Sequence, residues 1–254
     1  MSESHHDRRL EGRIALVTGA AGAGIGQATA RRLLRDGAAV AVTDIHEGRT
    51  VKTADALSEL GRVIGVPMDA GDRGAIDAAL AAVRAELGPV DILINNAAIN
   101  PIGNVAELST EDWDRTIDVD LSGPWYLMRA VVPQMAEAGR GSIVNVTSVA
   151  GFIGTANEGP YAAAKAALHC LTRTVAAEYG PSGIRCNCVA PGLVWTKFME
   201  KFEDQFRPEI ERTPLRRYGM PEDVADVIAF LASEESRFIT GETITVSGGW
   251  YMRP

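Results

Sequence analysis

Three residues, Ser148, Tyr161 and Lys165, carry side chains that can hold or move a proton. The stretch GPYAAAKAALHCLTRT contains strong helix formers and no breaker before Gly180, which predicts a single helix. Residues four apart share a helix face, so the phenol of Tyr161 and the ammonium of Lys165 are expected side by side. A phenol titrates at about pH 10 in water, and a neighbouring cation favours the phenolate. We therefore expect a lowered pKa for Tyr161. Ser148 precedes this tyrosine by thirteen residues in the chain.

A Tyr-x-x-x-Lys pair alone is common by accident, and the alternative is a surface tyrosine beside a solvated lysine. The start of the chain favours the chemical interpretation. Residues 13–18, RIALVT, predict a buried strand that leads into the glycine-rich turn GAAGAGIG at 19–26 and then a helical pattern. This order is the context of a dinucleotide site. The glycines let the backbone approach a pyrophosphate, and the helix start near Ile25 presents unpaired N–H groups to it.

Asp44 lies near the end of a second predicted strand, AAVAVTDI, 18 residues beyond Gly26. An acidic group at this place accepts hydrogen bonds from the ribose hydroxyls of adenosine and repels a 2′-phosphate. No arginine or lysine lies in the glycine turn or immediately after Asp44 to hold such a phosphate. The sequence therefore predicts NAD as the cofactor, in preference to NADP.

These two sites resemble the short-chain dehydrogenase/reductase family, and the likeness covers almost the whole chain. The matching phrases are Thr18-Gly19 with Gly24-Ile25-Gly26, Asn95-Asn96-Ala97-Ala98, residues 191–196, residues 219–225, and Thr240-Gly241 with residues 246–249. The resemblance implies an alcohol dehydrogenase or ketoreductase that acts on CH–OH groups with NAD(P). It also implies a homotetramer built from the long helices and the C-terminal region.

The resemblance assigns a role to each catalytic position. Ser148 hydrogen-bonds the substrate oxygen, Tyr161 is the general acid or base, and Lys165 binds the nicotinamide ribose and lowers the pKa of the tyrosine. Contacts with the cofactor are expected at Gly19, Gly22, Gly24, Ile25, Gly26, Asp44, Asp69, Ala70, Asn96, Tyr161, Lys165, Pro191, Val194 and Thr196.

The sequence departs from the family in three places. The cofactor turn is one residue longer than usual, and Gly22 is expected to absorb the extra residue as a local bulge. Ala98 replaces the last glycine of the Asn-Asn-Ala-Gly phrase. Asp120 replaces an asparagine that in the family holds a water in a proton relay toward the lysine. As an anion, Asp120 either pairs with Lys165 and opposes phenolate formation, or points away or only holds the water. We favour the second arrangement, because an ion pair would work against the chemistry.

Strand and helix patterns alternate along residues 13–254, which predicts one domain. Strands are expected at 13–18, 38–45, 62–69, 90–95, 141–147, 184–189 and 243–246, and helices at 72–87, 110–137, 161–179 and 221–233. This alternation predicts an α/β fold with a doubly wound parallel seven-stranded sheet and helices on both faces, a Rossmann fold. Ligands of such a sheet lie beyond the carboxyl ends of the strands.

Composition limits the class of protein. The chain has 254 residues, 46% of them hydrophobic, and no run reaches the roughly 18 apolar residues of a membrane span. Residues 1–12 lack an apolar signal segment, so we expect a flexible arm on a cytoplasmic protein with no membrane contact. The net charge of −8 argues against a nucleic-acid partner. The histidines do not cluster as metal ligands, and Cys186 and Cys188 are expected to be buried apolar residues of one strand.

Residues 197–217, KFMEKFEDQFRPEIERTPLRR, interrupt the alternation. They form either an exposed amphipathic helix or, as the resemblance implies, a lid over the substrate. The apolar residues of the segment are Phe198, Met199, Phe202 and Phe206. They favour an apolar or alicyclic substrate, and 3-oxoacyl thioesters, steroids and sugar alcohols are the other candidates.

Two alternative functions stay open. One is an NADP-linked ketoreductase, which Asp44 opposes. The other is a catalytically impaired NAD-sensing protein, supported only by Asp120 and the longer turn.

Overall fold

The computed structural model describes residues 8–196 and 203–252. Its centre is a seven-stranded sheet, all parallel, in the order β3-β2-β1-β4-β5-β6-β7. The strands are β1 Ile14–Val17, β2 Ala39–Asp44, β3 Val63–Pro67, β4 Ile92–Asn95, β5 Gly141–Val146, β6 Ile184–Pro191 and β7 Thr243–Val246. The predicted fold class and all seven predicted strands are confirmed.

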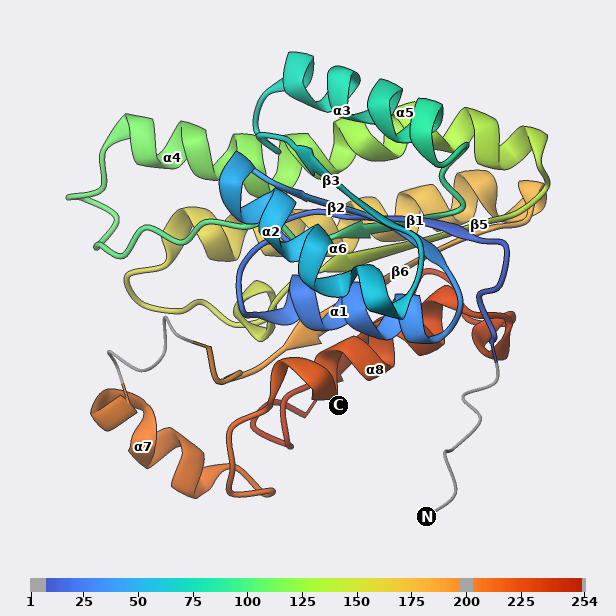
Figure 1. Ribbon diagram of the computed structural model, residues 1–254. Helices are drawn as coiled ribbons and strands as arrows, with labels where there is room; N and C mark the ends of the chain where they lie inside the picture. The colour runs from blue at the N-terminus through green and yellow to red at the C-terminus, as the bar shows by residue number, and fades with distance from the viewer. Residues whose placement is uncertain (1–7, 197–202, 253–254) are drawn as a thin grey trace.

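Helices cover both faces of the sheet (Figure 1). They are α1 Ile25–Arg35, α2 Glu47–Leu57, α3 Arg73–Glu86, α4 Thr110–Ile117, α5 Gly123–Glu137, α6 Gly159–Tyr179, α7 Glu203–Arg212 and α8 Pro221–Ala232. One hydrophobic cluster joins α1, α2 and α8 to the sheet, and a second joins α3, α5 and α6 to its other face. In α1, Thr29, Ala30, Leu33 and Leu34 are buried at helical spacing, which is why this stripe faces the strands.

The order of the sheet reverses beside β1, whose neighbours are β2 and β4. At such a point the connections leave the sheet toward opposite faces, which opens a crevice at the carboxyl ends of the strands. Asp44 and Asn95 are the last residues of β2 and β4, and Ser148 follows β5 by two residues. The topology thus places these side chains around one crevice.

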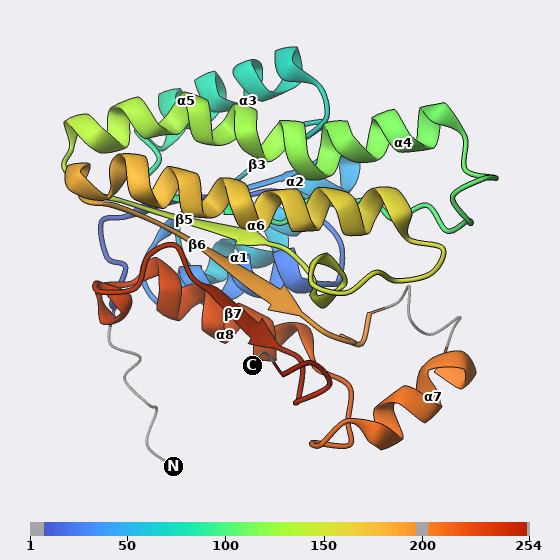
Figure 2. The same cartoon turned by 180° about the vertical axis from the view of Figure 1, so that it is seen from behind.

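The helix expected at 110–137 is divided. Between α4 and α5 lies a π-helical turn at Asp118–Ser122, closed by a hydrogen bond from the N–H of Gly123 to the carbonyl of Asp118. Figure 2 shows α4 and α5 running nearly end to end above α6. A Cβ atom on Gly123 would lie 2.0 Å from the carbonyl oxygen of Ala70, so only glycine permits this approach of α5 to the loop after β3.

The two peripheral segments expected from the sequence are partly described. Within the expected arm, Leu10 is buried and its N–H donates to the carbonyl of Asp36, while Arg9 pairs with the Asp36 carboxylate at 2.9 Å. The chain is therefore packed before residue 13, and residues 1–7 lie outside the described residues. Of the expected lid, 197–202 also lie outside the described residues, including Phe198, Met199 and Phe202, and α7 follows. No helix in the described part is long and apolar enough to cross a membrane.

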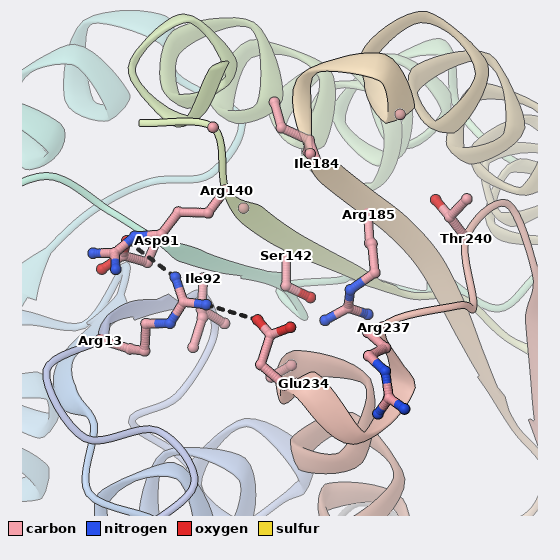
Figure 3. Close-up of a pocket in the computed structure, with 15 residues that line it drawn as sticks. Arg13, Asp91, Ile92, Arg140, Ser142, Ile184, Arg185, Glu234, Arg237 and Thr240 are labelled. Carbon is pink, nitrogen blue, oxygen red and sulfur yellow. Dashed lines mark hydrogen bonds and ion pairs between the residues drawn. The ribbon is translucent and has the colours of Figure 1, made fainter. Parts of the chain in front are cut away.

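A cavity of about 430 Å³ lies at the amino ends of β4, β5 and β6, away from the crevice. Arg13 pairs there with Asp91 at 3.6 Å and Glu234 at 2.9 Å (Figure 3). Arg185 donates to the carbonyl of Leu231 at 2.8 Å, where α8 ends. These arginines connect the amino ends of the strands to the end of α8 and to the turn that follows it. The cavity contains none of the predicted site residues.

Replacing Gly123 with alanine tests the contact with Ala70. Because the opposing atom belongs to the backbone, we expect the free energy of unfolding to fall by about 2–3 kcal/mol, the upper range for overpacking. The matched control is Gly180→Ala, since Gly180 has a helical backbone and a Cβ there meets nothing within 4 Å. Denaturant unfolding of both variants measures the difference. Equal stability of the two would contradict the steric account.

Candidate active site

A second cavity, of about 420 Å³, opens at the carboxyl ends of the strands and contains the three predicted catalytic residues in its wall. Ser148 follows β5, and Tyr161 and Lys165 belong to α6. The Nζ atom of Lys165 lies 5.4 Å from the centroid of the Tyr161 ring, as the i,i+4 spacing predicts. Predicted cofactor residues in the same wall are Ile25, Asn96, Pro191, Val194 and Thr196.

The N-terminal part of α6 places Tyr161 and Lys165 in the wall of the cavity. Glu158 is the N-cap residue, and Pro160 occupies the first turn, where its missing N–H costs no helical hydrogen bond. Lys165 follows almost two turns later and is buried, with 2% of its side chain exposed. Its Nζ atom donates to the carbonyl of Val146, at the end of β5, at 3.2 Å.

Asp120 lies against Lys165, so the arrangement favoured from the sequence is wrong. The Oδ2 atom of Asp120 is 3.2 Å from Nζ of Lys165, and its Oδ1 atom accepts a hydrogen bond from the N–H of Ile99 at 2.9 Å. Its side chain is fully buried in the π-helical turn. Burial raises the pKa of Asp120, and Lys165 and the Ile99 N–H lower it without offsetting that effect. The physical reason for the contact is that a buried ammonium requires a partner.

The pKa of Tyr161 also differs from the sequence-based expectation. Burial raises it above the ordinary value of a phenol, while Lys165 and a hydrogen bond with Ser148 lower it without offsetting the burial. The anions of Asp120 and Glu158 raise it further. The protein alone therefore holds Tyr161 as a neutral phenol, mainly because burial disfavours the phenolate and, to a smaller extent, because two carboxylates lie nearby.

The glycine turn is fixed from inside by Asn96. Its Nδ2 atom donates to the carbonyls of Thr18 at 2.9 Å and Gly19 at 3.1 Å, and Gly19 has a left-handed backbone, φ +62°. A Cβ atom on Gly26 would lie 2.5 Å from the Asn96 Nδ2 atom. Gly22, expected to absorb the extra residue through unusual backbone angles, does not have a positive φ, and its open side meets no atom within 4 Å.

The start of α1 fits a dinucleotide. Its N-cap residue is Gly24, no side chain caps the first turn, and no acidic residue lies in it. The first N–H groups are thus free to bind a pyrophosphate. The Asp44 carboxylate accepts hydrogen bonds from the N–H groups of Ala21 at 3.3 Å and His46 at 3.1 Å. These bonds hold it beside the glycine turn that precedes α1. A ribose diol suits this acceptor.

Two arginines that the sequence did not reveal approach the predicted cofactor acids. Arg115 of α4 holds both carboxylate oxygens of Asp69, at 2.7 and 2.9 Å. Although burial raises the pKa of Asp69, the hydrogen bonds from Arg115 and the Gly71 N–H outweigh it and lower the pKa overall. Arg49, in the first turn of α2, lies 3.7 Å from Asp44. The short distance along the chain from Asp44 to Arg49 could have predicted the second contact. No feature of the sequence could have predicted the first, because Arg115 and Asp69 are 46 residues apart.

Other residues of the cavity wall also escaped sequence reasoning. They are Glu158, Asn100 and, from the C-terminal segment, Trp250, whereas Phe206 of α7, an apolar residue of the expected lid, also lies in the wall. The spacing of three residues between Glu158 and Tyr161 was a usable sign for the first of these.

Cys186 and Cys188 of β6 are buried, as the sequence predicted. Burial raises the pKa of Cys188 to about 11, and the Thr172 hydroxyl lies 3.0 Å from its sulfur. These thiols belong to the core and take no part in the cavity.

A doubly wound parallel sheet, an uncapped glycine turn and a serine, tyrosine and lysine in one crevice define a class of dinucleotide-dependent oxidoreductases. Comparison with known proteins agrees. A family model described as Enoyl-(Acyl carrier protein) reductase matches residues 19–251. The chain belongs to the short-chain dehydrogenase/reductase family. It is therefore an NAD(P)-dependent oxidoreductase that acts on CH–OH groups.

Three relatives illustrate the similarity. The 3-oxoacyl-[acyl-carrier-protein] reductase FabG of Thermotoga maritima is 41% identical, over 95% of this chain and 98% of its own length. The cis-4-hydroxycyclohexanecarboxylate dehydrogenase of Sinomonas cyclohexanicum is 42% identical, over 94% and 96%. The solved structure of a 3-oxoacyl-[acyl-carrier protein] reductase with bound NAD from Brucella melitensis superposes with a TM-score of 0.88 at 37% identity, covering 100% of this chain and 98% of that chain.

Replacing Asp120 with asparagine tests the carboxylate beside Lys165. Removing an anion that raises the pKa of Tyr161 should lower that pKa, so the rise of alcohol oxidation with pH should move to lower pH. At pH 7 we expect oxidation to change by less than about tenfold, equal to ~1.4 kcal/mol in activation free energy. Asp118→Asn, an exposed residue of the same turn, should leave the profile in place. Loss of activity with unchanged folding would show that the carboxylate itself takes part in catalysis.

Proposed function

We propose that the protein is an NAD-dependent oxidoreductase that interconverts a secondary alcohol and a ketone. The observation that carries this proposal is the meeting of Ser148, Tyr161 and Lys165 in one cavity at the topological reversal of the sheet. When bound, the nicotinamide would supply or accept the hydride. The chain itself would bind the substrate oxygen and donate a proton to it or remove one from it.

Each catalytic side chain has a role that its surroundings support. The Ser148 hydroxyl would hydrogen-bond the substrate oxygen, and Tyr161, beside it, would donate a proton to that oxygen or remove one. Lys165 would bind the nicotinamide ribose and supply the positive field that favours phenolate. Asp120 would position Lys165, because its carboxylate lies 3.2 Å from the ammonium.

The proposed cofactor site extends from the glycine turn to the end of β6. The N–H groups of Ile25 and its neighbours would hold the pyrophosphate and Asp44 the adenosine ribose. The other proposed contacts are Gly19, Gly22, Gly24, Gly26, Asp69, Ala70, Asn96, Pro191, Val194 and Thr196.

The wall of the cavity supports an apolar or alicyclic substrate, or a 3-oxoacyl thioester. The wall includes several large apolar side chains: Ile102, Val149, Leu193, Phe206 and Trp250. The names of the relatives cover both substrate classes. A panel of alicyclic alcohols, their ketones and 3-oxoacyl thioesters, followed by the absorbance of reduced nicotinamide, tests the proposal. Failure of every compound with both cofactors would leave the NAD-sensing alternative.

The assembly and its location are also proposals. We propose a cytoplasmic homotetramer. In support, Trp113 of α4 and Trp125 of α5 keep 46% and 43% of their surface exposed, which suits helices that pack against another copy of the chain.

The first prediction of this function concerns cofactor choice. We expect NAD to be preferred over NADP by more than about tenfold, and Asp44→Ala to reduce that preference by about 1–3 kcal/mol, the scale of charged hydrogen bonds. The variant removes the acceptor for the ribose and leaves Arg49 free to bind a 2′-phosphate. Arg49→Ala, the control, should keep the preference for NAD. Steady-state kinetics with both cofactors measures it, and equal use by the unaltered protein would support the NADP-linked alternative.

The second concerns proton transfer. Tyr161→Phe removes only the hydroxyl, so turnover should fall by a factor of about a hundred or more, the usual contribution of general acid–base catalysis. Binding of NADH, followed by fluorescence, should persist because the many other proposed cofactor contacts are unchanged. Tyr126→Phe, on α5 and outside the cavity, is the matched control. Near-normal turnover of the Tyr161 variant would place the proton donor on another residue.

A further inference from the structure

Glu158 places a carboxylate in the wall of the active-site cavity. It is the N-cap residue of α6, three positions before Tyr161 and seven before Lys165. Tyr161 lines the same cavity and the charge of Glu158 acts on its hydroxyl, so the carboxylate lies near the tyrosine. None of the roles proposed for Ser148, Tyr161 and Lys165 uses it.

The loop after β4 holds Glu158 in place. The Nδ2 atom of Asn100, from the segment after β4, donates to its Oε1 atom at 2.8 Å. The backbones of Gly103 and Glu158 form a parallel bridge, and the N–H of Gly103 donates to the carbonyl of Asn157 at 3.0 Å. Asn157 has a left-handed backbone, φ +67°, a conformation that asparagine tolerates better than most residues. The carboxylate is thus oriented by contacts from outside its own helix.

The cavity offers this carboxylate no free positive partner among the described residues. Lys165 is the one cation in that part of the wall, and it is already shared between Asp120 and the carbonyl of Val146. The wall otherwise presents mainly neutral polar and apolar side chains, Ile102, Leu193, Phe206 and Trp250 among the latter. A carboxylate can only accept hydrogen bonds, and it repels another anion most strongly where water is scarce.

We propose that Glu158 is a specificity-determining residue that accepts a hydrogen bond from a donor group of the substrate remote from the reacting carbon. The inference rests on the proposed function and narrows its substrate class. The substrate carries an apolar ring or chain with a second hydroxyl or another neutral donor. The same site discriminates against substrates with a carboxylate at that place. Cis-4-hydroxycyclohexanecarboxylate, named for one relative, belongs to the disfavoured group.

The test compares two ligands of the same shape, cyclohexanecarboxamide and cyclohexanecarboxylate, on the protein saturated with NADH. Calorimetry gives both dissociation constants without any need for turnover. We expect the amide, which has N–H donors, to bind at least about tenfold more tightly than the anion. In Glu158→Gln, which keeps the shape and removes the charge, the ratio should fall to within about threefold, mainly through tighter binding of the anion. Glu107→Gln, an exposed residue of the loop after β4, should keep the wild-type ratio.

Several outcomes would overturn the inference. They are equal or tighter binding of the carboxylate by the wild type, an unchanged ratio in Glu158→Gln, and binding of neither ligand. A merely structural role of Glu158 would weaken both ligands alike and leave the ratio constant. If the ratio behaves as expected but no alcohol or ketone is turned over with NAD, the proposed function fails while the binding role of Glu158 stands.

Discussion

The buried ammonium of Lys165 is the charge around which the active site is arranged. Taking an ammonium out of water is costly unless hydrogen bonds and an opposite charge compensate for the lost hydration. The carboxylate of Asp120 and the carbonyl of Val146 provide that compensation, each at 3.2 Å. They belong to the π-helical turn and to the end of β5, so one cation ties both to α6. Removing one partner of such a pair typically costs about 3–5 kcal/mol, because the other charge stays buried.

The contact with Asp120 weakens the effect of the Lys165 charge on the pKa of Tyr161. The anion that makes burial of Lys165 tolerable also weakens the field that Lys165 exerts on Tyr161, and Glu158 adds a second negative charge nearby. Together with burial, which has the largest effect, these charges keep the tyrosine a neutral phenol in the protein alone, the form that can donate a proton to a substrate oxygen. Asp120 therefore both compensates for the burial of Lys165 and contributes, after burial itself, to the raised pKa of the tyrosine.

The sequence allowed the sheet and the three catalytic positions to be predicted because both depend on local patterns. Apolar runs alternate with helical stretches, and the spacing of Tyr161 and Lys165 places them on one helix face. The direction of Asp120 was not predictable in this way, since it follows from the energy of burying a lysine 45 residues further on. The division of the helix at Asp118–Ser122 depends on the approach of Gly123 to Ala70, 53 residues away. Contacts of this kind leave no periodic signal in the chain.

The π-helical turn also alters which faces of α4 and α5 coincide. An α-helix turns by about 100° per residue, so Trp113 and Trp125, 12 residues apart, would point about 120° away from each other on an unbroken helix. A π turn accommodates one extra residue, and the rotation between them becomes that of 11 residues, three turns plus about 20°. The single π-helical turn in which Asp120 is buried thus places the exposed indoles of Trp113 and Trp125 on the same side of the continuous helix formed by α4 and α5. An inward chemical feature and an outward apolar stripe share one irregularity, and a change that restores a regular helix would disturb both together.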